Sequence, residues 1–208
     1  MKINHRERAN AIRESEMTQI CSPAQADLTA GGGVAPARTL RLKDGRAVVL
    51  RVVESGNASA VQQFVRRLSD RSRRNRFFST VRELSTDQLH RVTRSRPPGE
   101  LVLVAEAAEG VGSCIVAMAQ YAACEPSEVE FAVVVDDAWQ RQGLGMQLIG
   151  VLAEYAARAG FGAYTGYVLT DNWPMLALLD RLDCELVAAD DPCALRVIKR
   201  LDTHTLPV

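Results

Sequence analysis

Lysine is scarce in this chain of 208 residues, because only Lys2, Lys43 and Lys199 are lysines and the other 22 of its 25 basic residues are arginines. Net charge is absent as well, since 25 acidic residues balance the 25 basic ones. A protein that binds nucleic acid through an overall positive charge is therefore not expected. No apolar run approaches the roughly 18 residues of a membrane-spanning helix, so no membrane partner is expected either.

Paired cysteines and clustered histidines are also missing. The five cysteines form no CxxC pair, and His5, His90 and His204 are scattered along the chain. This pattern argues against a disulfide framework and gives no sign of a metal site, so we expect no bound metal. The charged amino terminus contains no apolar segment like that of a signal peptide. The expected location is therefore the cytoplasm, with reduced thiols.

Composition divides the chain into a leader and one domain. Residues 1–37 mix charged residues with Ser, Ala and Gly and end in Gly31-Gly32-Gly33 and Pro36, which predicts a flexible N-terminal tail. Regular apolar patterns begin near Leu40. A single domain is therefore predicted over residues 38–208, with enough hydrophobic residues for a sizeable core.

The order of the apolar patterns predicts a mixed α/β fold. Strands are expected over residues 47–53, 100–107, 112–121, 129–136, 161–170, 186–189 and 195–201. Helices are expected over residues 58–68, 72–79, 86–92, 143–159 and 172–182. The second half thus contains a strand–helix–strand unit, which places two strands side by side and a helix across them.

The most informative stretch is the turn between an expected strand and an expected helix. The strand ends in Val133-Val134-Val135, and the helix opens at Gln140-Arg141-Gln142-Gly143-Leu144-Gly145. Free N–H groups and the helix dipole attract anions at such a start, and glycine lets a phosphate approach the backbone. No GK[ST] is present, and Leu148 stands where a dinucleotide fingerprint needs its third glycine. The glycines alone leave a phosphate site and a plain turn equally open.

Several stretches together resemble a known family. Gln140-x-x-Gly143-x-Gly145 resembles the acetyl-CoA pyrophosphate loop of the GNAT N-acetyltransferases. The stretches that resemble the Pat-type bacterial protein lysine acetyltransferases are Arg76-Phe77-Phe78-Ser79 with Val81-Arg82-Glu83-Leu84, Glu130-Phe131-Ala132-Val133-Val134, and Asn172-x-x-Met175-Leu176. The resemblance implies the GNAT fold, a mostly antiparallel central sheet of about six to seven strands, splayed at the cofactor site and flanked by helices.

The resemblance also implies how acetyl-CoA, the expected co-substrate, would bind. The backbone of residues 140–145 would hold the pyrophosphate, the strand before it would pair with the pantetheine arm, and Asn172 would lie near the thiol. Arg141 would add a phosphate contact or remain a solvated arginine, and Asn172 is also a natural helix N-cap. The cofactor-binding residues implied in this way are Val133, Val134, Val135, Gln140, Arg141, Gln142, Gly143, Leu144, Gly145, Met146, Asn172 and Met175.

Glu130 is the expected catalytic residue, because the matching glutamate of the resembling subgroup is its general base. An amine is protonated near pH 7 and must lose a proton before it attacks a thioester, and a carboxylate whose pKa is raised by burial can accept that proton. Glu128 precedes it on the same strand face, as a relay or as a solvated edge charge. Because residues 172–182 contain no tyrosine, protonation of the leaving thiolate would fall to water or to the thiolate itself.

The sequence thus predicts an acetyl-CoA-dependent N-acyltransferase that acetylates protein lysine side chains by direct attack in a ternary complex. Residues 101–140 hold seven acidic and no basic residues, which favours a lysine-bearing protein partner. The alternatives are a small-amine N-acetyltransferase and a non-catalytic acetyl-CoA-binding regulatory module. The arginine-rich residues 61–100 are expected to form a solvated or internally paired face and not a nucleic-acid surface. The oligomeric state is left open.

Overall fold

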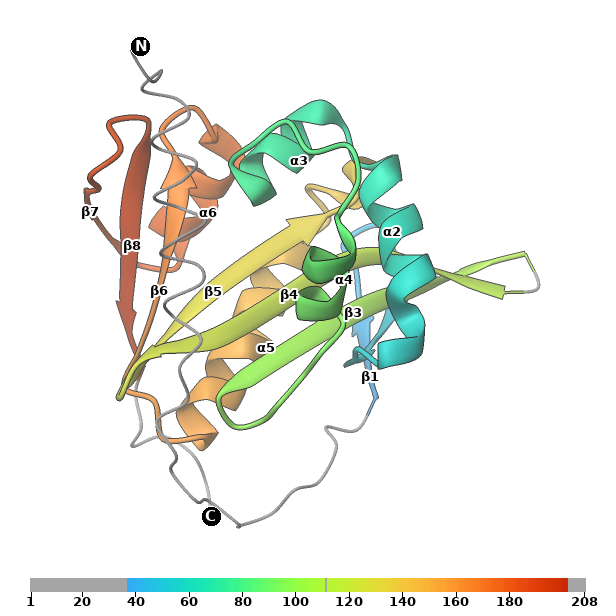
Figure 1. Cartoon of the computed structure of the whole chain (residues 1–208), viewed down its shortest axis with the longest axis horizontal. Coiled ribbons are helices and arrows are strands. Elements are labelled where there is room, and N and C mark those ends of the chain that lie inside the picture. Colours follow the sequence, from blue (N-terminus) through green and yellow to red (C-terminus); the bar gives the residue numbers. More distant parts are fainter. Residues whose placement is uncertain (1–36, 111, 202–208) are drawn as a thin grey trace. The chain divides into compact units, whose positions relative to one another are not determined.

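Eight strands form one sheet in the computed structural model, which describes residues 37–110 and 112–201. The strands are β1 (Arg38–Arg41), β2 (Ala47–Val52), β3 (Glu100–Glu109), β4 (Gly112–Glu125), β5 (Glu128–Val135), β6 (Ala163–Leu169), β7 (Glu185–Ala188) and β8 (Ala194–Arg200). Their order across the sheet is β1-β2-β3-β4-β5-β6-β8-β7 (Figure 1). Only β5 and β6 pair in parallel, and the other neighbours are antiparallel.

The helices come close to the expected ranges. They are α2 (Ala58–Arg67), α3 (Asp70–Phe77), α4 (Thr86–Val92), α5 (Leu144–Arg158) and α6 (Trp173–Arg181), with short 3-10 turns η1 (Ser55–Asn57) and η2 (Asp137–Trp139). The mixed α/β class is therefore confirmed. The expected tail over residues 1–37 falls outside the described residues, apart from residue 37 itself, and stays a prediction.

The strand count differs from the expected six to seven because β1 has no strong sequence signal. Its four residues read Arg-Thr-Leu-Arg, and only Leu40 is buried. β1 is held by its pairing with β2, from Arg38 opposite Leu50 to Arg41 opposite Ala47. A strand this short is set by its partner more than by its own pattern.

The helices cover both faces of the sheet, and alternation along the strands divides the core between them. Val102 and Val104 of β3 pack with Phe64 of α2. Leu101 and Leu103 point to the opposite face, where they pack in one cluster with α5. Figure 1 accordingly shows α4 in front of strands β3 to β5 and α5 behind them. We call the side that packs with Phe64 the α3 face, because Phe77 of α3 packs against the same cluster. We call the opposite side the α5 face.

The starts of two helices differ in their capping, and one of them tests the N-cap expected at Asn172. The Ser85 side chain accepts a hydrogen bond from the Gln88 N–H (3.2 Å), and the Gln88 side chain accepts one from the Ser85 N–H (2.8 Å), a reciprocal cap at the start of α4. Asn172 occupies the N-cap position of α6, but its side chain forms no capping bond. No helix of the described residues is long and apolar enough to cross a membrane.

Candidate active site

A gap between β5 and β6 interrupts the sheet on the carboxyl side of Glu130. The two strands pair only from Glu128 opposite Ala163 to Glu130 opposite Thr165. Beyond that point β5 continues along β4 as far as Val135, and β6 continues along β8 as far as Leu169. Among the described residues the parallel ladder therefore ends at Glu130, and the facing edges beyond it are separate.

Phe131 and Gly166 shape the start of this gap. A Cβ atom built on Gly166 would lie 3.0 Å from both the ring and the carbonyl oxygen of Phe131, so no larger residue fits without movement. The Phe131 ring packs edge to face against Tyr164, with 4.8 Å between ring centroids. Aromatic packing thus fixes Phe131 between the strands at the point where they part.

The backbone of β5 presents hydrogen-bonding groups to the gap. The Asp136 N–H donates to the Val116 carbonyl of β4 (2.8 Å). The backbone N–H and C=O groups of successive strand residues point to opposite sides, so those of Val134 also point towards β4. The backbone groups of Val133 and Val135 therefore point into the gap. The carbonyl of Val135 accepts a hydrogen bond from Gln140 Nε2 (3.0 Å), which leaves both groups of Val133 and the N–H of Val135 for a ligand.

The turn before α5 leaves a set of backbone N–H groups free. Gly143 is the N-cap, with φ of +83°, and Arg141 is also left-handed, with φ of +60°. The first helical bond runs from the Gln147 N–H to the Gly143 carbonyl (3.2 Å). The N–H groups from Gly143 to Met146 therefore have no partner within the helix, while buried Leu144 anchors the turn to the core. Anions bind to N–H groups arranged in this way, so the turn is compatible with a phosphate site, which stays a prediction.

Gly145 has a second reason to be glycine. A Cβ atom there would lie 3.3 Å from Leu178 Cδ1, so α5 and α6 come into close contact at this residue. Met175 of α6 is half-buried beside the same helix junction. The glycine therefore serves helix packing whether or not a phosphate is bound.

Asn172 is buried beside the end of β6, with 7% of its surface exposed. Its backbone carbonyl accepts from the N–H groups of Met175 and Leu176, each at 3.0 Å. Its side-chain amide forms no capping bond and is not among the fully buried atoms that lack a partner, so it keeps some access to solvent. An accessible amide at this place could contact a polar ligand.

Glu130 lies on the α3 face, at the position where the parallel ladder ends. It alternates with Val129 and Phe131, which pack on the α5 face, and it shares the α3 face with Val134. Burial raises the pKa of Glu130 above its usual value, and the charge of Arg76 on α3 partly opposes this. Burial in turn lowers the pKa of Arg76 to about 10, and Glu130 opposes that shift.

Gln120 of β4 is a neighbour of Glu130 that the sequence did not indicate. Gln120 pairs with Ala132 and Glu130 pairs with Ala122, so two small residues alternate with two long polar ones on one face. The Gln120 Oε1 atom is buried without a hydrogen-bond partner among the described residues. A buried acceptor of this kind is unusual and calls for a donor from outside the described protein.

Glu128 forms an ion pair that the sequence did not indicate. Its Oε2 atom lies 3.5 Å from Nη2 of Arg196 on β8, in a half-exposed ion pair. Since β8 pairs with β6, this contact ties β5 to the far half of the sheet at the base of the gap.

Comparisons with known proteins bear on this geometry. The family model described as "Acetyltransferase (GNAT) family" matches residues 63–183, more than half of the chain. The chain belongs to the GNAT acetyltransferase family. The match includes the gap, the glycine turn, Glu130 and Asn172, but the functional roles of these residues stay predictions.

A curated acetyltransferase from Pseudomonas aeruginosa is 34% identical over 124 residues, which cover 58% of this chain and 65% of that protein. The match thus spans less than two thirds of that relative. The GNAT domain of PAT from S. lividans has a TM-score of 0.72 at 25% identity, covering 79% of this chain and 97% of that domain. The protein yncA from Salmonella typhimurium, solved with its cofactor acetyl-CoA, has a TM-score of 0.58 at 19% identity, covering 77% and 98%.

In this GNAT chain, Asp137 fastens α3 to the turn before α5. Its carboxylate accepts hydrogen bonds from the Ser69 N–H (2.9 Å), the Ser69 hydroxyl (2.7 Å) and the Ser72 hydroxyl (2.9 Å). Partial burial favours the protonated form, but the hydrogen bonds from the two serines outweigh it and lower the pKa of Asp137. Gln140 adds a bond from Nε2 to the Ser72 hydroxyl (3.0 Å), so its side chain braces the turn.

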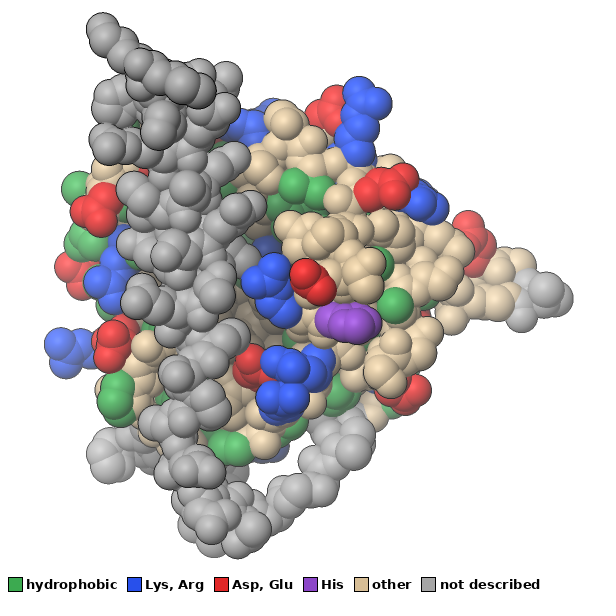
Figure 2. All heavy atoms as spheres, in the orientation of Figure 1, with side chains coloured by type: hydrophobic (Ala, Val, Ile, Leu, Met, Phe, Trp, Pro, Cys, Tyr) green, Lys and Arg blue, Asp and Glu red, His purple; other side chains and the backbone are tan. Residues whose placement is uncertain are grey.

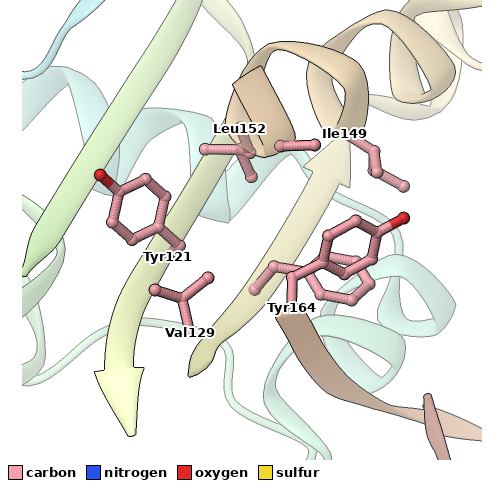
Figure 3. Close-up of a pocket in the computed structure, with 7 residues that line it drawn as sticks. Tyr121, Val129, Ile149, Leu152 and Tyr164 are labelled. Carbon is pink, nitrogen blue, oxygen red and sulfur yellow. The ribbon is translucent and has the colours of Figure 1, made fainter. Parts of the chain in front are cut away.

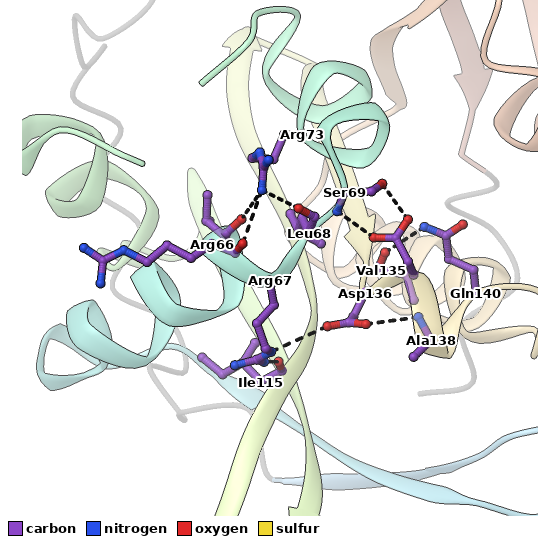
Figure 4. Close-up of polar contacts among 12 residues, drawn as sticks. Arg66, Arg67, Leu68, Ser69, Arg73, Ile115, Val135, Asp136, Ala138 and Gln140 are labelled. Carbon is purple, nitrogen blue, oxygen red and sulfur yellow. Dashed lines mark hydrogen bonds and ion pairs between the residues drawn. The ribbon is translucent and has the colours of Figure 1, made fainter. Parts of the chain in front are cut away.

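A second contact joins the end of α2 to the same turn. Arg67 donates from Nη2 to the Ile115 carbonyl (2.6 Å), and its Nε atom lies 3.7 Å from Asp136 Oδ2. Asp136 also accepts a hydrogen bond from the Ala138 N–H (3.1 Å). Figure 4 shows these contacts converging where β5 ends. We call Asp136, Asp137 and their partners Arg67, Ser69 and Ser72 the α3 latch.

One small apolar pocket of the GNAT domain lies apart from this site. It is lined by Tyr121, Val129, Phe131, Ile149, Leu152, Ala153 and Tyr164, between the sheet and α5 (Figure 3). It lies on the α5 face, opposite Glu130, and has no room for a water molecule. We interpret it as a packing feature of the apolar core.

The charged residues around the site are paired and not segregated. Arginines of the 61–100 block form ion pairs with Glu83, Asp136, Asp171 and Glu100. Figure 2 shows Lys and Arg side chains beside Asp and Glu side chains on the visible face. Within residues 37–110 and 112–201 no three His, Cys, Asp or Glu residues are grouped to hold a metal ion.

Proposed function

We propose that this GNAT protein transfers the acetyl group of acetyl-CoA to an amine, and that the amine is a lysine side chain of a protein. The observation that carries the proposal is the gap between β5 and β6, which has Glu130 at its base and free N–H groups at its end. A thioester donor laid along this gap would bring its reactive end near Glu130. The Salmonella protein solved with acetyl-CoA shares the fold.

The residues of the gap fit the chemistry of acetyl-CoA, which supplies the activated acetyl group. The N–H groups from Gly143 to Met146 would bind the pyrophosphate at the positive end of the α5 dipole. Val133 and Val135 would hydrogen-bond the amide groups of the pantetheine arm as an added strand would. The side-chain amide of Asn172 would bind the arm from the α6 side.

Glu130 would act as the general base. The acceptor amine is protonated in water and must lose a proton before its nitrogen attacks the thioester carbonyl. Burial raises the pKa of Glu130, which makes its carboxylate a stronger base, and the charge of Arg76 limits this rise. The Gln120 carbonyl oxygen would orient the amine by accepting a second N–H bond.

A protein lysine is the acceptor that the surroundings of Glu130 favour. Glu128 is paired with Arg196, so Glu130 is the carboxylate of this face that would attract a cationic side chain. The Pat-type resemblance and the likeness to the GNAT domain of PAT support the same acceptor. Because the four cysteines of the described residues are all free, we further propose that the reaction takes place in the cytoplasm.

The test compares wild type with Glu130→Gln and with a matched control, Glu83→Gln, in which an exposed ion pair with Arg66 is lost. CoA release is measured with a lysine-containing peptide, with spermidine and with free amino acids. We expect Glu130→Gln to lower turnover by about 100-fold to 10,000-fold without weakening acetyl-CoA binding, and Glu83→Gln to leave both unchanged.

Each remaining outcome contradicts part of the proposal. Turnover of spermidine or amino acids without any turnover of lysine peptides would establish the small-amine alternative. Acetyl-CoA binding without turnover of any amine would indicate a non-catalytic module. Normal turnover by Glu130→Gln would exclude Glu130 as the base.

A further inference from the structure

The turn between β1 and β2 packs against the turn that precedes α5. The Lys43 N–H donates to the Gln142 carbonyl (3.2 Å). The Arg46 guanidinium donates to the Ala138 carbonyl (3.2 Å) and lies over the Trp139 ring, with 3.8 Å from its carbon to the ring centroid. One backbone bond, one side-chain bond and one cation–π contact thus fix the position of the β1–β2 turn.

The charges of this turn leave one cation uncompensated. Asp44 is neutralised by Arg46, whose Nε lies 2.7 Å from Asp44 Oδ2 and whose N–H donates to Asp44 Oδ1 (3.0 Å). No carboxylate of the described residues forms an ion pair with Lys43. The net positive charge of the turn therefore resides on the Lys43 ammonium group.

The stem of Lys43 lies over the glycine that begins α5. A Cβ atom built on Gly143 would lie 3.6 Å from Lys43 Cε and 3.8 Å from Lys43 Cγ. The ammonium nitrogen is one bond beyond Cε, so it lies close to the start of the helix. A larger residue at position 143 would have to adopt a left-handed backbone conformation, which favours glycine. Its side chain would also lie against the stem of Lys43.

We propose that Lys43 binds a phosphate group of acetyl-CoA and supplements the neutral N–H donors of residues 143–146 with a full positive charge. This inference rests on the proposed function, because the phosphate belongs to the acetyl donor. Backbone N–H groups orient a phosphate but carry only partial charges, and an ammonium group adds a point charge to such a cradle. The β1–β2 turn is then part of the donor site, although it lies some 100 residues earlier in the sequence.

The experiment measures acetyl-CoA binding by calorimetry, without an acceptor, for the full chain and for Lys43→Arg, Lys43→Met and Lys43→Glu. We expect the dissociation constant to increase about tenfold in Lys43→Met, more in Lys43→Glu, and less than about threefold in Lys43→Arg, which keeps the charge. High salt should shrink these differences, since the lysine is exposed. Thermal unfolding of each variant checks that the fold is retained.

The matched control is Lys199→Met. Lys199 lies on β8, which is far from β1 and β2 in the strand order. Its Nζ atom is 3.7 Å from Asp183 Oδ2. We expect this variant to bind acetyl-CoA like wild type. A repeat with 3′-dephospho-acetyl-CoA shows which phosphate Lys43 contacts. If the ratio of dissociation constants between Lys43→Met and wild type is unchanged, Lys43 contacts the pyrophosphate. If the two proteins then bind equally, Lys43 contacts the 3′-phosphate.

Two results would overturn the inference. If Lys43→Met binds acetyl-CoA as tightly as wild type, or if Lys199→Met weakens binding equally, Lys43 does not contact a phosphate. These results leave the proposed function intact. If wild type does not bind acetyl-CoA at all, the proposed function and this inference both fail.

Discussion

Gln120 places a buried amide oxygen beside Glu130 without a hydrogen-bond partner among the described residues. A buried polar atom without a partner lowers stability, so its retention is understandable if the acceptor amine completes the bond during catalysis. Gln120→Leu should therefore increase the free energy of unfolding by about 1 kcal/mol and reduce kcat/KM for the acceptor. Urea unfolding and steady-state kinetics measure the two effects.

Gln62 is the matched control for that prediction, because both ends of its amide are satisfied. Its Nε2 donates to the Leu84 carbonyl (3.0 Å), and its Oε1 accepts from the Leu84 N–H (3.0 Å). Gln62→Leu should thus destabilise the protein by about 1–3 kcal/mol. If both variants change the free energy of unfolding in the same direction, the missing hydrogen-bond partner of Gln120 does not destabilise the protein.

Arg76 should set the pH at which Glu130 becomes active. Burial raises the pKa of Glu130 and the Arg76 charge lowers it, so Arg76→Met should raise that pKa further. The base must be deprotonated to accept a proton. The acidic limb of kcat/KM against pH should therefore move to higher pH in Arg76→Met, with the rate recovered by raising the pH.

Arg76→Lys separates charge from packing in that prediction. The lysine keeps a cation near Glu130, so the acidic limb should stay close to that of wild type while Arg76→Met is displaced. An equal loss of activity at every pH in both variants would mean that Arg76 acts through the fold of α3 and not through the charge of Glu130.

At the scale of elements, the gap depends on close contact between two strands. Gly166→Ala should lower the free energy of unfolding by about 1–3 kcal/mol, because a Cβ atom there would lie 3.0 Å from the Phe131 carbonyl. Gly150→Ala is the control. Gly150 lies in α5, and a Cβ atom placed there would meet nothing within 4 Å, so alanine should stabilise the helix by about 0.5–1 kcal/mol. Similar effects of the two substitutions in chemical denaturation would contradict the steric account.

The α3 latch connects the helix that carries Arg76 to the turn that would bind phosphate. Asp137→Ala removes the acceptor of three hydrogen bonds, so we expect a loss of about 1–3 kcal/mol in stability and weaker acetyl-CoA binding. Asp70→Ala is the control, since that carboxylate is 90% exposed on the same helix. Calorimetric titration that shows equal acetyl-CoA affinity in both variants would exclude a role for the latch in donor binding.

Local patterns predicted the elements better than the contacts between them. Apolar patterns located helices α2, α4 and α5 and strands β3 to β5, because such patterns depend on residues that are neighbours in sequence. β1 was missed because its position depends on pairing with β2. The sequence placed Glu130 and the glycine turn through resemblance. It could not indicate Lys43 or Gln120, whose interest arises only from residues brought close by folding.

At the scale of the whole domain, charge blocks in the sequence do not become charge blocks in space. Arg66 pairs with Glu83 within its own segment, whereas Arg67 and Arg74 reach Asp136 and Asp171 in later segments. The arginine-rich helices therefore neutralise acids of the strand ends and turns around the gap. Their contribution is to hold the α3 face in place, which agrees with the expected internally paired face.

The gap also divides the sheet into two parts that differ in the size of the hydrophobic clusters packed against them. Strands β1 to β5 share large clusters with α2 and α5, whereas Val168 of β6 and Val197 of β8 form a small cluster with Leu179 of α6. The parts are joined by a short parallel ladder, by the Glu128–Arg196 ion pair, by the ring contact of Phe131 with Tyr164 and by the contact between α5 and α6 at Gly145. Local stability should therefore be lower in the part built from β6, β7, β8 and α6.

Hydrogen exchange measured by mass spectrometry tests this division and the donor site together. Without ligand, amides of β6, β7, β8 and α6 should exchange faster than those of β3 and β4. Acetyl-CoA bound between β5 and β6 would bridge both parts, and at 100 times its dissociation constant it should stabilise the fold by about 2.7 kcal/mol. Protection should then rise most in β6 and α6, while ATP, used as a control without the pantetheine arm, should leave these segments unchanged. Faster exchange in β3 and β4, or an equal effect of ATP, would contradict a gap that is closed by the pantetheine arm.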